Sequence, residues 1–303
     1  MPVSMRDAFG EAITELSRIN PEVLALTADL GSSTRLTEFA REFPDRYFNV
    51  GVAEADLIGI AAGLALEGFT PFCTSFAVFV PGRCFDQIRV SVCQNKANVK
   101  LVGSHSGFSN PGDGATAQSI EDIALMRVLP EMTVICPADA VETKKAVMTM
   151  AEKPGPAYLR ISRTETEIIT KEDDPFEIGR ATILRGGKKV TLIACGTMVP
   201  VALKAAEEID GEVINLSSVK PLDQETILKS VKKTGQVITV EEHSIFGGMG
   251  SAVAEFLSQK YPVPIKIIGI NDVFGQSARS YEELLEKYGL TVENIIKIAN
   301  SKF

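Results

Sequence analysis

The sequence predicts an α/β protein with two consecutive domains, each built on a mainly parallel sheet flanked by helices. Short apolar runs, such as residues 23–27 and 190–196, alternate with helical patterns along most of the chain. Continuous apolar strands of this kind are typical of parallel sheets whose two faces are both covered. A charged and poorly periodic stretch, residues 164–185, interrupts the alternation once, as a linker between domains does.

Length and composition fit this division. The chain has 303 residues, which is enough for two domains of roughly 120–170 residues each. Hydrophobic residues make up 45% of the chain and charged residues 23%, as in ordinary globular proteins. We therefore expect a first domain at 1–165, a linker at 166–185 and a second domain at 186–303. The formal charge of −8 argues against a nucleic-acid-binding protein, which needs a basic face.

Each expected element follows from its local pattern. Strands are expected where apolar residues dominate a short run, at 23–27, 99–103, 133–137, 157–161, 190–196, 212–216, 236–240 and 265–269. Helices are expected between them, at 55–66, 140–151, 199–209, 251–259, 281–288 and 292–299. The first of these helices is unusually rich in small residues.

The cysteines and the start of the chain indicate a cytoplasmic protein. The five cysteines are an odd number and none has C-x-x-C spacing, so buried, reduced thiols fit best. The first residues lack the apolar core of a signal peptide. No window offers about 18 uncharged apolar residues, the length that a membrane-spanning helix needs.

Glu54 is the first candidate for chemistry. It lies just before the expected helix 55–66, among small and apolar residues. A carboxyl group in such surroundings can hold or pass a proton. The alternative is a carboxylate that only meets the positive end of the helix dipole.

An aromatic segment follows, with side chains at Phe72, Phe76, Phe79 and Phe85. These rings either pack in the core or offer a surface on which a flat cofactor ring can stack. The sequence leaves both readings open.

His105 is the third candidate. It lies at the carboxyl end of the expected strand 99–103, where open α/β sheets place their ligands. The polar loop that follows indicates function more than core packing, although a structural histidine remains the alternative. Arg6, Arg160 and Arg163 can bind phosphate if the fold brings them together, and otherwise are surface charges.

The segment 241–250 is the last candidate. It contains two carboxylates, a histidine and several glycines, and we expect a glycine-rich turn between a strand and a helix. A phosphate cradle at the helix start is conceivable, but the carboxylates and the lack of a lysine favour close backbone packing.

Taken together, these stretches resemble the transketolase family over essentially the whole chain. The motifs that support the resemblance, in chain order, are residues 72–79, 85–89, 103–107, 113–114, 121–124, 161–163, 241–250, 275–277 and 284–290. The resemblance implies a thiamine-diphosphate pyrimidine-binding domain followed by a transketolase C-terminal domain.

The resemblance also assigns the cofactor contacts. Glu54 falls on the glutamate that hydrogen-bonds N1′ of the aminopyrimidine of thiamine diphosphate and so promotes deprotonation of the thiazolium ring. Phe79 falls on the aromatic residue that stacks on the aminopyrimidine, with Phe76 beside it. Asp29 falls on an acidic residue near the cofactor and the donor sugar.

Sugar contacts are implied in the same way. His105 and Asp113 match residues that contact substrate hydroxyls, and His105 joins Glu54 as an expected catalytic residue. Arg6, Ser33 and Arg163 match the binders of the sugar phosphate. Arg163 is preferred over Arg160 because it follows Ser162 in the motif.

Two departures from the family pattern concern the substrate and the metal. Ala117 stands where many transketolases have a histidine, so the usual pentose phosphates are not assured as substrates. Gly112-Asp113-Gly114 resembles half of a diphosphate-binding metal motif, but the asparagine that completes such a motif does not follow. We therefore expect no metal site on this chain, and Mg²⁺ or Ca²⁺ held by a second chain that carries the diphosphate domain.

The resemblance thus predicts the C-terminal subunit of a two-chain, thiamine-diphosphate-dependent transketolase that moves a two-carbon ketol unit between sugar phosphates. We expect a heterotetramer built around a dimer of this chain. The alternatives are the beta subunit of a 2-oxoacid dehydrogenase, a deoxyxylulose-phosphate-synthase-like enzyme and a non-catalytic paralogue. The His105 loop and Arg163 favour a sugar phosphate over a lipoyl-bearing partner, and the retained Glu54 counts against loss of activity.

Overall fold

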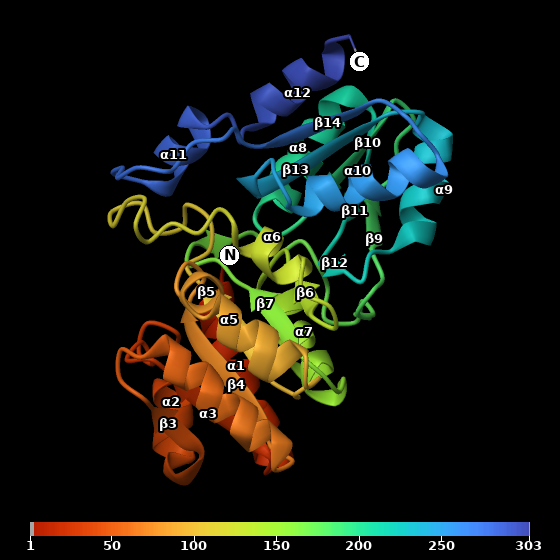
Figure 1. The fold of residues 1–303 in the computed structure, drawn as a ribbon. Coiled ribbons are helices and arrows are strands. Elements are labelled where there is room, and N and C mark those ends of the chain that lie inside the picture. The colour runs from red at the N-terminus through yellow and green to blue at the C-terminus, as the bar shows by residue number, and fades with distance from the viewer. Residues whose placement is uncertain (1–2, 303) are drawn as a thin grey trace.

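Two α/β units follow one another along the chain, as Figure 1 shows, with the earlier one in red to green and the later one in green to blue. The structure is a computed structural model that describes residues 3–302. Within this range the strands form a seven-stranded sheet, a five-stranded sheet and a small pair. The mixed α/β class and the mainly parallel sheets predicted from the sequence are confirmed.

The seven-stranded sheet has the order β12-β6-β7-β5-β4-β2-β3, and its strands are parallel except for β12. Their bounds are β2 Val23–Thr27, β3 Tyr47–Asn49, β4 Thr70–Phe76, β5 Lys100–Ser104, β6 Thr133–Ile135, β7 Ala157–Arg160 and β12 Ser218–Lys220. Every residue of β2, β5 and β7 is buried. Burial on both faces explains why apolar residues dominate these strands.

Helices cover both faces of this sheet. Their bounds are α1 Met5–Ile19, α2 Thr37–Glu42, α3 Glu54–Leu66, α4 Val80–Arg83, α5 Phe85–Gln87, α6 Asp122–Arg127 and α7 Ala140–Glu152, with a 3₁₀ turn at Pro44–Arg46 and a π-helix at Ile88–Cys93. Leu24 and Leu26 point to a core shared with α3, whereas Val23 and Ala25 point to the core under α1 and α7. Successive side chains of β2 point to opposite faces of the sheet, so the strand contributes residues to both cores.

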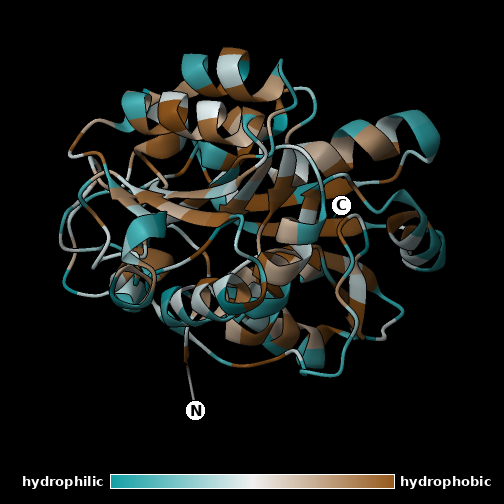
Figure 2. Cartoon of the chain, turned by 90° about the horizontal axis from the view of Figure 1, so that it is seen from below, coloured by the Kyte–Doolittle hydropathy of each residue, from teal (hydrophilic) through white to brown (hydrophobic). Residues whose placement is uncertain are grey.

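The five-stranded sheet has the order β14-β13-β10-β11-β9 and is parallel except for β9. Its strands are β9 Thr182–Arg185, β10 Val190–Ala194, β11 Gly211–Asn215, β13 Val237–Ser244 and β14 Ile265–Ile270. Its helices are α8 Met198–Ile209, α9 Gln224–Thr234, α10 Met249–Lys260, α11 Tyr281–Lys287 and α12 Val292–Asn300. In Figure 2 the apolar colour concentrates on the central strands and the polar colour on the outer helices.

Three strands depart from a simple division at the expected linker. β8, Glu165–Thr166, pairs with β1, Val3–Ser4, at the other end of the first domain. β9 falls inside the segment expected as a linker and forms an edge of the second sheet. β12 comes from the second half of the chain, yet it pairs with β6 in the first sheet. The two units are therefore joined by shared sheet pairing as well as by a connecting segment.

One expected element boundary is wrong. The sequence predicts a strand that ends at residue 240 and a turn at Glu241, Glu242 and His243, but β13 continues to Ser244 with all three residues buried. Their polar atoms have hydrogen-bond partners on other elements, described below, and such partners make burial of charged groups tolerable. The other expected strands and helices are present and differ only at their ends.

Two further findings concern the cysteines and the helices. All five cysteines are free thiols and buried, as predicted. Among residues 3–302, none of the helices combines the length and the apolar character needed to cross a membrane.

Candidate functional site

Several parallel strands end at one edge of the seven-stranded sheet, and the predicted site residues follow those ends. After β2 the chain forms β3 on one side of β2, and then forms β4 on the other side. The carboxyl edge between β2 and β4 is therefore a topological switch point, where open α/β sheets bind their ligands. Asp29 follows β2, Phe76 ends β4 and His105 follows β5.

Glu54 is the first residue of α3, and its side chain is only 6% exposed. Its Oε1 atom accepts a hydrogen bond from Nη1 of Arg83 at 2.8 Å. Arg83 ends the short helix α4, and its side chain is 53% exposed. A buried carboxylate is thus held by a cation that reaches it from the solvent side.

The aromatic segment divides between core and site. Phe72 is fully buried in the core, whereas Phe76 and Phe79 are only half-buried. The rings of Phe76 and Phe79 lie nearly parallel, with centroids 5.6 Å apart, and the guanidinium carbon of Arg83 lies 4.0 Å from the centroid of Phe79. Phe79 therefore presents a stacking surface on which a planar cation already rests.

His105 adopts a left-handed backbone conformation with φ 57° and is buried. Its ring stacks on Phe76 with centroids 3.8 Å apart, and its Nδ1 lies 3.0 Å from Oγ of Ser104. Burial, together with the charges of Arg6, Arg163 and Arg35, lowers the pKa of His105 to about 3. The imidazole is therefore neutral at physiological pH, and can both donate and accept a hydrogen bond. A non-glycine residue in this backbone region at a sheet edge is typical of functional sites.

Three arginines surround His105. Nη1 of Arg6 donates to the carbonyl of Ser33 at 2.9 Å. Burial, and then the charges of Arg35 and Arg163, lower the pKa of Arg6. Arg35 pairs with Asp7 at 2.5 Å, while within residues 3–302 the buried Nε of Arg6 has no hydrogen-bond partner. Like charges gathered around an unpaired donor favour an anionic ligand.

A polar loop completes this side of the site. Nη1 of Arg163 donates to Oδ1 of the buried Asn110 at 2.7 Å, and Nδ2 of Asn110 donates to Asp113 at 2.6 Å. Asn110 therefore links Arg163 to Asp113, two residues far apart in the sequence. In the described part of the chain, histidine, cysteine and acidic residues form no group of three or more that could hold a metal ion.

Asp29 follows β2, which β4 separates from β5 in the sheet. Its N–H donates to Oδ1 of Asn49 at 3.0 Å, and Nδ2 of Asn49 donates to its carboxylate at 3.2 Å. The same Oδ1 accepts the N–H of Gly51 at 3.0 Å. Asn49 thus ties the end of β2 to the loop that leads to Glu54.

Four residues of the site are not among the candidates predicted from the sequence: Arg35, Asn49, Arg83 and Asn110. Two of them carried a usable signal. Arg83 stands four residues after Phe79, a spacing that one helical turn brings together. Asn49 ends a strand at the ligand-binding edge. Arg35 and Asn110 carried no such signal, because their roles depend on elements distant in the sequence.

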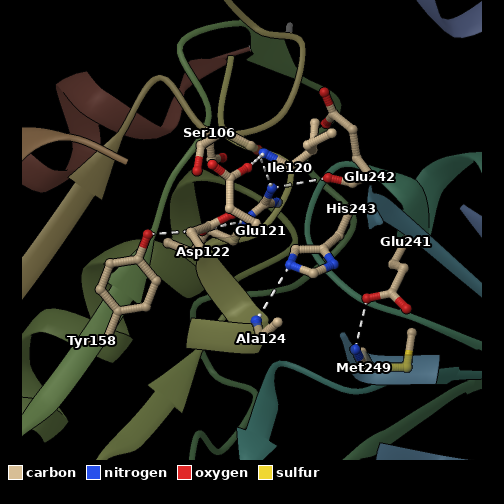
Figure 3. A network of polar contacts seen from close by, with 12 residues as sticks. Ser106, Ile120, Glu121, Asp122, Ala124, Tyr158, Glu241, Glu242, His243 and Met249 are labelled. Atoms are coloured by element: carbon tan, nitrogen blue, oxygen red, sulfur yellow. Dashed lines mark hydrogen bonds and ion pairs between the residues drawn. The ribbon is translucent and has the colours of Figure 1, made fainter. Parts of the chain in front are cut away.

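Arg160 belongs to a buried network between the two units, drawn in Figure 3. Nε of Arg160 donates to Asp122 at 2.8 Å, and its Nη2 donates to the carbonyl of Glu242 at 2.9 Å. The hydroxyl of Tyr158 also donates to Asp122 at 2.8 Å. Arg160 is only 5% exposed. Its hydrogen bonds hold it at the interface between the two units. Arg163, in contrast, is exposed and contacts Asn110 of the polar loop.

The segment 241–250 does not form a phosphate cradle. The N–H groups of Met249 and Gly250, at the start of α10, donate to the carboxylate of Glu241 at 2.6 and 2.8 Å. His243 accepts the N–H of Ala124 at Nε2, and its Nδ1 faces the carbonyl of Ser244 at 2.8 Å. A carboxylate of the chain itself occupies the position that an anion would take, and the prediction of close backbone packing is confirmed.

Comparison with known proteins gives a consistent family. Residues 1–168 match the family described as the pyrimidine binding domain of transketolase, and residues 179–295 match its C-terminal domain. A protein of Methanocaldococcus jannaschii described as a transketolase C-terminal section is 46% identical over 301 residues, covering 97% of this chain and 94% of that protein. The 6-deoxy-6-sulfo-D-fructose transketolase subunit SqwH of Clostridium sp. (strain MSTE9) is 41% identical over 301 residues, covering 98% and 93%.

A solved structure agrees with the sequence comparisons. The chain described as "Split gene transketolase, inactive beta4 tetramer" superimposes with a TM-score of 0.90 at 45% sequence identity. The match covers 99% of this chain and 97% of that one. Both units, and not only the first, are therefore shared with that protein.

Proposed function

Since the chain belongs to the transketolase family, we propose that it is the C-terminal subunit of a two-chain, thiamine-diphosphate-dependent transketolase. In this proposal the enzyme transfers a two-carbon ketol unit between sugar phosphates. One observation carries the proposal: Glu54, Phe79 and His105 converge at the switch point of the first sheet, beside a cluster of arginines. The bound cofactor supplies the nucleophilic carbon for the transfer.

The cofactor end of the site comprises Glu54, Phe76, Phe79 and Asp29. Glu54 holds the proton of the aminopyrimidine N1′, and its burial keeps water from competing for that hydrogen bond. Phe79 stacks on the pyrimidine ring, and Phe76 packs nearly parallel to Phe79. The fit is supported by Arg83, since a planar N–H donor already rests on Phe79 and points at Glu54.

The sugar end comprises Arg6, Ser33, His105, Asp113 and Arg163. Arg6 and Arg163 hold the phosphate of the sugar, with Ser33 fixing the guanidinium of Arg6 through its carbonyl. The neutral His105 and the carboxylate of Asp113 bind sugar hydroxyls. His105 is the second catalytic residue in this assignment, because it lies between the arginines and Phe76.

A second chain is the other part of the proposal. After its first turn, which carries Glu54 and Asp56, helix α3 contains only apolar residues and glycine, yet Ile60 is 43% exposed and Leu66 is 66% exposed. Among residues 3–302, no atom lies within 4 Å of a Cβ placed on Gly59 or Gly63. A helix that is apolar all round is normally buried, so this face supports a docked chain. We assign to that chain the diphosphate-binding domain with its Mg²⁺ or Ca²⁺, in a cytoplasmic heterotetramer built around a dimer of the present chain.

Reconstitution tests the proposal. The chain is mixed with a separately produced diphosphate-binding chain, thiamine diphosphate and Mg²⁺, and two-carbon transfer is measured over a panel of pentose and other ketose phosphates. We expect transfer by the mixture and none by either chain alone. Transfer by this chain alone would contradict the two-chain arrangement, and an assembled complex that is inert across the panel would contradict the ketol transfer.

A further inference from the structure

Arg83 connects the two groups to which the cofactor is assigned. Its Nη1 donates to Glu54 at 2.8 Å, and its guanidinium carbon lies 4.0 Å from the centroid of the Phe79 ring. The guanidinium is planar and carries N–H donors in its plane, so one flat group satisfies a carboxylate and an aromatic face at the same time. A pyrimidine ring whose N1′ is protonated, and which therefore donates to a glutamate while it stacks on a phenylalanine, makes the same two contacts.

The two occupants exclude each other. Phe76 packs nearly parallel to Phe79 with centroids 5.6 Å apart, and the guanidinium of Arg83 lies over the Phe79 ring as well. Glu54 is 6% exposed, and its Oε1 pairs with Arg83. A ring in van der Waals contact with Phe79 therefore requires the guanidinium to leave.

Arg83 can leave at little cost. Its side chain is 53% exposed, and it ends a helix of four residues. A Cβ placed on the neighbouring Gly82 meets no atom of residues 3–302 within 4 Å, so the surrounding space is open. The displaced guanidinium regains water, whereas the buried Glu54 keeps a partner in the incoming ring.

We propose that Arg83 is a displaceable placeholder for the pyrimidine ring of the cofactor. In the free site it keeps the buried Glu54 paired and the Phe79 ring in place, and it swings into solvent when thiamine diphosphate binds. This inference rests on the proposed function, because it takes Glu54 and Phe79 as the cofactor contacts. Its consequence is unusual for a site arginine: removing the side chain strengthens cofactor binding.

Calorimetric titration of thiamine diphosphate with Mg²⁺ into the reconstituted two-chain complex tests the placeholder. Arg83→Ala removes a half-exposed ion pair and a cation–π contact that compete with the ring, so we expect it to tighten binding on the order of 3- to 10-fold. Arg83→Lys, which keeps the charge but not the planar stacking, is expected to fall between Arg83→Ala and the native chain. Arg41→Ala is the matched control, since Arg41 pairs with Glu38 at an exposed position, and it is expected to leave binding unchanged.

The outcomes separate this inference from the function on which it rests. Weaker or unchanged binding by Arg83→Ala, with Glu54-dependent binding by the native chain, overturns the placeholder and leaves the proposed function standing. Binding that Glu54→Gln leaves unaffected, or no binding by the native complex, overturns both. A thermal transition of the Arg83→Ala chain close to the native one verifies that the variant is folded.

Discussion

Glu54 and Glu242 are both buried carboxylates, but their partners differ. Glu242 accepts the N–H of Phe108 and, at 2.7 Å each, the hydroxyls of Thr197 and Tyr281. Burial raises the pKa of Glu242, and those three donors oppose the rise. Glu54 instead meets Arg83, whose side chain is half exposed. A buried charge whose partners are fixed belongs to the scaffold, whereas one whose partner can be displaced is available to a ligand.

The arginines repeat the contrast. Arg160 is held by Asp122 and two carbonyls between the two units, where the structure offers it no alternative position. Arg163 follows it by three residues, is exposed, and contacts the polar loop through Asn110. The same residue type thus serves stability at one position and anion binding at the other.

The first prediction concerns Glu54, the buried carboxylate whose partner can be displaced. If Glu54 holds a proton of the cofactor, Glu54→Gln lowers ketol transfer by the reconstituted enzyme by about 10²- to 10⁴-fold, the usual range for removing an acid–base group. Its effect on folding is small, because the half-exposed Arg83 pair contributes at most about 1 kcal/mol. Activity assays and urea unfolding of the same preparation measure both effects.

Glu242→Gln is the matched control for this prediction. The amide oxygen can keep the N–H of Phe108, but the hydroxyls of Thr197 and Tyr281 must then turn from donating to accepting from the amide N–H₂. We therefore expect a loss of about 1 kcal/mol in the free energy of unfolding. A Glu54→Gln enzyme that keeps its activity would refute the assigned role of Glu54.

The second prediction compares the arginines by stability. Arg160→Met leaves the fully buried Asp122 without its cation, and breaking a buried pair in this way costs about 3–5 kcal/mol. Arg163→Met removes an exposed partner of Asn110 and is expected to cost less than about 1 kcal/mol. Urea unfolding monitored by circular dichroism gives both values, and equal losses would contradict the division into scaffold and site.

Much of the scaffold could be predicted from the sequence because its determinants are local. Strand β2 occupies the expected residues 23–27, since a run of five buried residues specifies both the element and its ends. Strand β13 was ended too early because Glu241 and Glu242 are charged. Their burial is possible because the N–H of Met249 donates to Glu241 and the N–H of Phe108 donates to Glu242. Phe108 is 134 residues from Glu242 in the sequence.

The site was predicted by its residue types and not by its pairings. Glu54 and His105 stood out through their surroundings and their places beside expected elements. Arg83 did not, because its contact with Glu54 spans 29 residues and requires α3 and α4 to meet at one sheet edge. Arg35 likewise acts on His105 only through the fold. Local patterns identify candidates, and tertiary packing decides which of them meet.

The third prediction extends the contrast to the surface of α3. Gly59→Glu places a carboxylate on the face that we assign to the partner chain. Folding of the isolated chain is expected to be unaffected or slightly improved, since glycine within a helix costs about 1 kcal/mol relative to good helix formers. Assembly is expected to weaken at least about tenfold, because an unpaired charge is buried at the contact.

Light scattering of the mixed chains measures this assembly. Gly186→Glu is the matched control, because Gly186 is exposed directly after β9 in the second unit and a Cβ there also meets no atom of residues 3–302 within 4 Å. Equal assembly by the Gly59 and Gly186 variants would exclude α3 as the docking surface.

The fourth and smallest prediction concerns the pH dependence that His105 gives the fold. Because the pKa of His105 is lowered to about 3 in the folded chain, the unfolded chain binds a proton near its ordinary value of about 6.5 while the folded chain does not. Stability from this residue is therefore fully present above about pH 6.5 and is lost as the pH falls toward the folded value. Between about pH 7 and pH 5.5 the loss amounts to about 1 kcal/mol.

His105→Asn isolates this contribution, since asparagine tolerates the left-handed backbone of φ 57° and does not titrate. The buried Lys100, whose pKa is lowered to about 7, changes its contribution mainly above this window, so it does not confuse the comparison. Urea unfolding of both chains at the two pH values gives the difference. We expect the native chain to lose about 1 kcal/mol more than the variant. Equal losses would mean that His105 gains its proton in the folded state, and its imidazole would then belong with the displaceable charges of the site and not with its neutral ligands.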